Sequence, residues 1–265
     1  MLLIPVPTHS RAQNLQAIAS LLVFLLFLFT PPSWAQQHDM SNMPDLSGTN
    51  HSAMHAPAVP EDPQTVAKRL ADKRESEFNH HLAGLFVFFA GTFILAQNRL
   101  GKRWTLARYV WPMCFLSAGL FLLVFSDTEI WPLGPQTPWY AITHSVEDLQ
   151  HKTFAIILLA VGYVEFQKAR GRYKSPWTAW FFPIVGGAGA ILLLFHVHSG
   201  NMEAPHAMET MEHIQQQHRW FATAGLGVAM TNLLAETPQK WQQVFKKVWP
   251  ALLIVLGILL TLYTE

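Results

Sequence analysis

The stretch Leu192–Trp220, LLLFHVHSGNMEAPHAMETMEHIQQQHRW, is a polar segment between two apolar runs. His196 and His198 close the first run, and His218 opens the second. The polar part contains further side chains of metal-ligand type, namely His206, Met208, Met211 and His213. Imidazole binds copper, zinc, iron and nickel, and thioether selects Cu(I). We therefore predict two membrane helices joined by a loop outside the membrane, with ligands for a transition metal, above all copper, at that boundary.

The composition indicates a protein embedded in a bilayer. Hydrophobic residues make up 51% of the 265 residues and charged residues only 13%, against about 25% charged in an average soluble chain. The net charge of +1, with no phosphate-binding glycine loop and no basic stripe, gives no indication of nucleic-acid binding. A single cysteine, Cys114, excludes an intrachain disulfide and a cysteine-based metal cage. The chain has 13 histidines, and this high number calls for a functional explanation.

Residues 1–35 have the features of a secretory signal peptide. Arg11 precedes an apolar core from Ile18 to Phe29, and Ser33 and Ala35 supply small residues for cleavage after Ala35. The alternative is an uncleaved anchor helix. In both cases the following chain emerges on the far side of the membrane.

Residues 36–63, QQHDMSNMPDLSGTNHSAMHAPAVPEDP, are polar and have no apolar period, which predicts an extended or disordered segment. Six residues of ligand type lie in it: His38, Met40, Met43, His51, Met54 and His55. This favours a flexible copper-catching arm, with a plain solvated linker as the alternative. Residues 64–78 carry charges of both signs and predict a short surface helix.

The rest of the chain, 79–265, predicts an all-α bundle of six transmembrane helices. Its apolar segments are 82–97, 109–125, 151–166, 177–195, 221–234 and 248–263. Eleven of the 18 lysines and arginines lie in alternate connections: Arg99, Lys102, Arg103, Arg108, Lys168, Arg170, Arg172, Lys174, Lys240, Lys246 and Lys247. The positive-inside rule places these connections in the cytoplasm. The prediction is a multi-pass protein of a bacterial-type inner membrane, with both mature termini outside.

This topology puts every histidine after the signal segment on the outer side. They are His38, His51, His55, His80, His81, His144, His151, His196, His198, His206, His213 and His218. None falls in a predicted cytoplasmic loop. Such one-sidedness indicates a function at the outer, periplasmic face.

One motif opens the third apolar segment. His144, Glu147, Asp148 and His151 have the spacing i, i+3, i+4, i+7, which would place all four on one helical face. They predict a metal site or a histidine pair oriented by carboxylates; the alternative is an amphipathic helix start with acids at its N-terminus. The predicted metal ligands are His81, His144, Glu147, Asp148, His151, His196, His198 and His218. A secondary group is formed by His206, Met208, Met211 and His213 together with the six residues of the arm.

A signal-led helical bundle with histidines at the outer helix ends and His/Met-rich outer segments resembles the copper resistance protein D family. The resemblance covers about residues 78–263 by architecture. The resemblance implies copper uptake or tolerance. The inner halves of the predicted helices have no obvious metal ligands, which favours binding or delivery at the periplasmic face, with a periplasmic copper chaperone as the partner. Two alternatives stay open: a redox protein with a b-type haem held by histidines of facing helices, and a metal-dependent membrane oxygenase. Whether the protein is an enzyme is left undecided.

Overall fold

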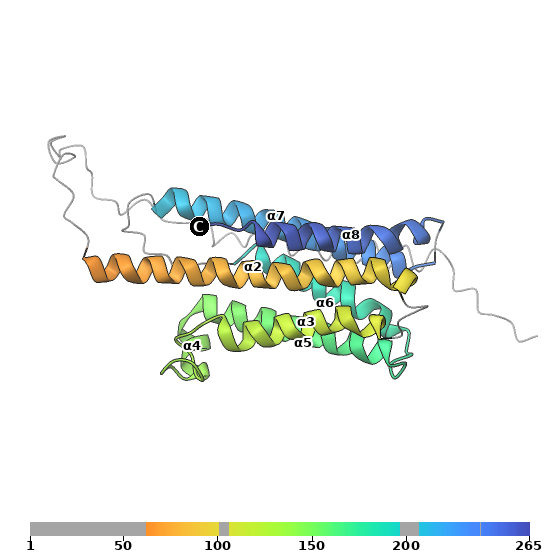
Figure 1. Ribbon diagram of the computed structural model, residues 1–265, viewed down its shortest axis with the longest axis horizontal. Helices are drawn as coiled ribbons and strands as arrows, with labels where there is room; N and C mark the ends of the chain where they lie inside the picture. Colours follow the sequence, from red (N-terminus) through yellow and green to blue (C-terminus); the bar gives the residue numbers. More distant parts are fainter. Residues whose placement is uncertain (1–61, 101–105, 197–206, 239) are drawn as a thin grey trace, which may run out of the picture. The chain divides into compact units, whose positions relative to one another are not determined.

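Seven α-helices make up the regular structure of residues 62–100, 106–196, 207–238 and 240–265, the part of the chain that the computed structural model describes (Figure 1). They are α2 (Pro63–Leu100), α3 (Ala107–Phe125), α4 (Pro138–His144), α5 (Val146–Ala169), α6 (Trp177–Leu193), α7 (Ala207–Glu236) and α8 (Gln242–Thr261). The only β-type pairing within these ranges is an isolated bridge between Ile130 and Gln136. The all-helical prediction is confirmed for this part.

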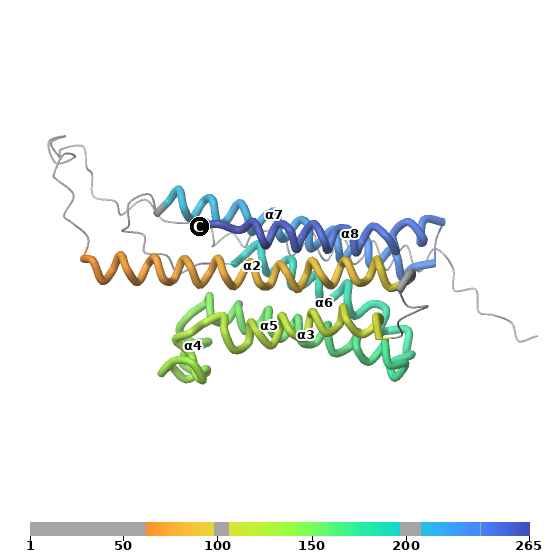
Figure 2. Tube along the Cα trace, in the orientation of Figure 1, coloured from red at the N-terminus to blue at the C-terminus, as the bar shows by residue number. Residues whose placement is uncertain are grey.

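Six of the helices form a closed ring. Helix α2 packs on α3, α3 on α5, α5 on α6, α6 on α7, α7 on α8, and α8 returns to α2 (Figure 2). The short helix α4 packs on α5. The first and last described helices are therefore neighbours.

Three of the ring helices, α2, α3 and α8, are long and apolar enough to cross a membrane. Helix α6 is apolar but has 17 residues. These helices indicate a membrane protein.

The segment predicted as a separate surface helix, 64–78, is continuous with the first apolar segment. Both belong to α2, a single helix of 38 residues. The reason is that residues 64–83 contain neither proline nor glycine, so nothing interrupts the backbone hydrogen bonds. At 1.5 Å per residue this helix is about 57 Å long, well beyond the roughly 30 Å hydrocarbon core of a bilayer.

Glycines bring the ring helices close together. A Cβ atom on Gly84 of α2 would lie 2.7 Å from the carbonyl oxygen of Gly257 on α8. A Cβ on Gly162 of α5 would lie 2.8 Å from the backbone nitrogen of Leu116 on α3. Small residues of this kind permit backbone contact between helices in membranes, so these two interfaces depend on glycine.

Successive ring helices run in opposite directions, so the ring has two unlike ends (Figure 1). The end that includes the starts of α2, α5 and α7, together with α4, is called here the histidine end. The opposite, basic end has the described cations Arg108, Lys168, Arg170, Arg172, Lys174, Lys240, Lys246 and Lys247. The predicted signal segment and all six ligand-type residues of the predicted arm lie outside the described residues.

Candidate metal centre at the histidine end

Four histidines from different parts of the ring meet at the histidine end. They are His80 on α2, His151 on α5, His196 just after α6 and His218 on α7. The ring centroids of His151 and His196 are 5.2 Å apart, those of His196 and His218 4.9 Å, and those of His218 and His80 5.6 Å. The four imidazoles therefore form a continuous chain of ring contacts, called here the histidine cluster.

Each ring of the histidine cluster donates a hydrogen bond through Nδ1. The acceptor is Ser76 O for His80 and Ile214 O for His218, both at 2.8 Å. For His151 the acceptor is Asp127 Oδ1 at 2.7 Å, and for His196 it is Gln150 Oε1 at 2.8 Å. Because carbonyl and carboxylate oxygens only accept, the proton lies on Nδ1 and the lone pair of each neutral ring lies on Nε2.

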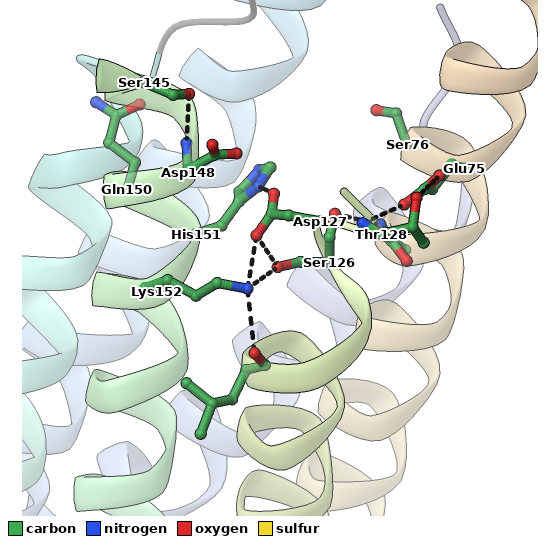
Figure 3. A network of polar contacts seen from close by, with 12 residues as sticks. Glu75, Ser76, Ser126, Asp127, Thr128, Ser145, Asp148, Gln150, His151 and Lys152 are labelled. Carbon is green, nitrogen blue, oxygen red and sulfur yellow. Dashed lines mark hydrogen bonds and ion pairs between the residues drawn. The ribbon is translucent and has the colours of Figure 1, made fainter. Parts of the chain in front are cut away.

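Asp127, in the connection after α3, is the charged centre beside the cluster (Figure 3). Its side chain is 8% exposed and accepts from His151 and from Lys152 Nζ, each at 2.7 Å, and from Ser126 Oγ at 2.5 Å. Burial alone would raise the pKa of Asp127, but the hydrogen bond and charge of His151 and the hydrogen bonds of Lys152 and Ser126 lower it to about 2. Asp127 is therefore ionised at neutral pH and fixes the orientation of the His151 ring.

Two side chains of α2 hold the Asp127 connection in place. Asn79 Nδ2 donates to Ser126 O at 3.2 Å. Glu75 accepts from the backbone nitrogen of Thr128 at 3.2 Å and from its hydroxyl at 3.0 Å (Figure 3). The same helix thus carries His80 and positions the carboxylate that orients His151.

Gln150 joins α5 to the end of α6. Its Nε2 donates to Phe195 O at 2.7 Å while its Oε1 accepts from His196. These two hydrogen bonds assign the nitrogen and the oxygen of the amide. Helix α6 ends at Leu193, so His196 lies beyond the end of the helix. Asp127, Asn79 and Gln150 were not among the predicted site residues, although a polar residue within or beside an apolar segment is itself a signal.

The prediction that one helix carries His144, Glu147, Asp148 and His151 was wrong. Helix α4 ends at His144, and Ser145 has an extended backbone and caps α5 by accepting from the backbone nitrogen of Asp148 at 3.1 Å. His144 is exposed and stacks on Tyr140, with ring centroids 4.1 Å apart. It is not part of the histidine cluster.

The first helix contributes His80 to the cluster, and not the predicted His81. His81 Nε2 is 2.9 Å from the carbonyl oxygen of Tyr263. Adjacent helical residues point about 100° apart, so only one of the two can face the ring interior. Glu147 and Asp148 do line the cavity beside the cluster, and burial, with the negative charge of Asp127, raises the pKa of Asp148.

The secondary His/Met group is only partly described. Met211 lines the cavity, Met208 is exposed, and His213 Nε2 is 3.4 Å from the Thr264 hydroxyl. His198 and His206 lie outside the described residues.

A cavity of about 940 Å³ extends from the histidine end into the ring. All four cluster histidines line it. Its charged lining is predominantly acidic: Asp72, Glu75, Asp127, Glu129, Glu147, Asp148 and Glu265 face three bases, Lys68, Arg69 and Lys73. Farther in, the walls are apolar and include Phe115, Val161, Phe182 and Val228.

Among the described residues, no three His, Cys, Asp or Glu side chains are arranged as a ready metal site. The histidine cluster is thus a convergence of rings whose nitrogens do not yet share one point.

Comparisons with protein-family models, with curated proteins and with solved structures found no match.

Proposed function

We propose that this chain is a six-span inner-membrane protein that binds copper at its periplasmic face, for uptake, tolerance or delivery. The six ring helices supply the spans, behind a signal peptide. The basic end faces the cytoplasm by the positive-inside rule, which turns the histidine end outward. The proposed ligands are His80, His151, His196 and His218.

The observation that carries this proposal is the common orientation of the four rings. Each donates Nδ1–H to an oxygen, as metal-ligating histidines do, and so keeps its lone pair on Nε2. Two imidazoles bound through Nε2 at about 2 Å from one metal have ring centres about 5 Å apart. The spacings of 4.9 and 5.2 Å around His196 match this requirement.

The nitrogens do not share one point as they stand, so metal binding would require side-chain movements that keep the Nδ1 hydrogen bonds. Copper is favoured over zinc because Met211 lines the same cavity and because soft thioethers select Cu(I). The remaining His and Met residues of the outer segments would then load the site.

Metal analysis of the detergent-purified protein, with copper added under oxidising and reducing conditions, tests the proposal. Wild type should hold one copper per chain. Exchange of both His196 and His218 for Ala should reduce this to background, whereas His144→Ala and His81→Ala, which alter histidines outside the cluster, should leave it unchanged. Equal copper content in all four proteins would refute the proposed site.

A b-type haem is the second candidate, because the cavity lies directly beside histidines of facing helices. Two of these histidines would be its axial ligands. An optical spectrum of the same sample decides between the two: a Soret band identifies haem, and bound copper without a Soret band supports the copper site.

A further inference from the structure

The inner part of the cavity lies between apolar walls. Protein interiors are close-packed, and voids larger than a water molecule are few and destabilising. The whole cavity, from its polar mouth to its apolar inner walls, has a volume of about 940 Å³, which is within the range of pockets that hold small molecules. Small residues on α6 leave this space open: a Cβ on Gly186 would have its nearest neighbour, Phe182 Cε1, 4.0 Å away.

We propose that this cavity binds a lipid-soluble quinol, with the hydroxylated ring at the histidine cluster and the apolar tail between α3, α5, α6 and α7. This inference does not require copper to bind, although a quinol hydroxyl and a copper ion would compete for the Nε2 atoms of the same histidines.

The charges around the cavity decide against an anionic head group. Seven carboxylates and three bases line it, and one of those bases, Lys68, lies 3.4 Å from Glu129. A phosphate at this level would meet a net negative field at short range. A neutral ring meets no such penalty, so the lining selects against phospholipid head groups.

The histidine tautomers decide between the two redox forms of a neutral ring. Because His80, His196 and His218 donate through Nδ1, their Nε2 atoms are acceptors when the rings are neutral. A quinol hydroxyl can donate to such a nitrogen, whereas a quinone carbonyl can only accept. The cluster therefore favours the reduced, hydroxyl-bearing form.

The test is equilibrium binding to the full chain in lipid nanodiscs under anaerobic conditions, with decylubiquinol as the probe. Decylubiquinone and decyl phosphate are the comparison ligands. Saturable binding of one quinol per chain is expected, at least fivefold tighter than that of either comparison ligand. Absence of saturable binding, or equal binding of decyl phosphate, would overturn the proposal.

Two variants locate the ligand. Gly186→Leu fills the cavity from α6 and should weaken quinol binding at least tenfold. Ile184→Phe adds bulk to the same helix on a 54% exposed position outside the cavity and should bind as wild type. Both should keep the wild-type melting temperature, which separates loss of the site from misfolding. Unchanged binding in Gly186→Leu, or a Soret band showing that haem fills the space, would contradict the proposal. A wild-type protein that binds quinol but holds no copper would refute only the metal site.

Discussion

Exchange of Asp127 for Asn should destabilise the ring by about 3 kcal/mol. The carboxylate accepts from His151, Lys152 and Ser126, and its side chain is 8% exposed. Asn removes the charge but keeps the shape, so the effect measures the electrostatic part of these contacts. Removing one partner of a buried ion pair costs about 3–5 kcal/mol. The lower end applies because Lys152 keeps hydrogen bonds to Leu123 O at 3.1 Å and to Ser126 Oγ at 3.3 Å.

The pKa of Asp127 gives a second measure of the same quantity. A pKa of about 2 in place of the ordinary 3.8 corresponds to about 2.4 kcal/mol of preference for the ionised form in the folded protein.

A double-mutant cycle measures the contact directly. Asp127→Asn, Lys152→Met and the double variant are unfolded at equilibrium in mixed detergent micelles at pH 7. The double variant should lose at least about 1.5 kcal/mol less than the sum of the single effects, because it leaves no uncompensated charge. Lys68→Met is the control: its contact with Glu129 is exposed on both sides (69% and 61%), so it should cost less than about 0.5 kcal/mol. Strict additivity in the Asp127–Lys152 cycle would refute the pairing.

Further predictions concern pH, a helix cap and a helix contact. Folding lowers the pKa of Asp127, so the stability that its ionised carboxylate contributes is complete above about pH 4 and is lost as pH falls toward 2. The melting curves of wild type and Asp127→Asn should therefore converge in that window. A constant difference in melting temperature would contradict the assignment. Ser145→Ala removes the cap of α5 and should cost about 1 kcal/mol, seen as a lower melting temperature, with Thr153→Ala at a half-buried position within α5 as the control. Gly257→Ala places a Cβ 2.5 Å from Phe88 N and should lower the melting temperature more than Ser145→Ala or Thr153→Ala does. Gly186→Ala, whose Cβ meets nothing closer than 4.0 Å, should be close to neutral in the same assay.

The helical segments were predictable because apolar length and interface residues determine them. Helix α3 was predicted as 109–125 and is Ala107–Phe125. The break at Ser145 was not predicted, although Ser145 and Asp148 have the spacing of an N-cap motif. The spacing of His144 and His151 places them on one helical face only if the helix is unbroken, and the extended backbone at Ser145 breaks it.

The gathering of histidines could be predicted from the sequence, but the members of the cluster could not. The one-sided distribution of the histidines predicts that they lie at one end of the bundle, and His80, His151, His196 and His218 do meet there. The choice between His80 and His81 depends on which face of α2 meets the ring. The period of His80, Ala83 and Val87, all of which line the cavity, carries that information. Asp127 was not identified because it lies in a connection whose path no period predicts.

Closure of the ring has a consequence for biogenesis. His80 stacks on Tyr263 with ring centroids 3.9 Å apart, and His81 is 182 residues from its hydrogen-bond partner Tyr263. When α2 leaves the ribosome, the helix that covers its glycine face has not been synthesised. Lipid or the insertion machinery must cover that face until α8 arrives. The contacts of Tyr263 with His80 and His81 can therefore form only after α8 has been synthesised, so a chain arrested before α8 would lack them.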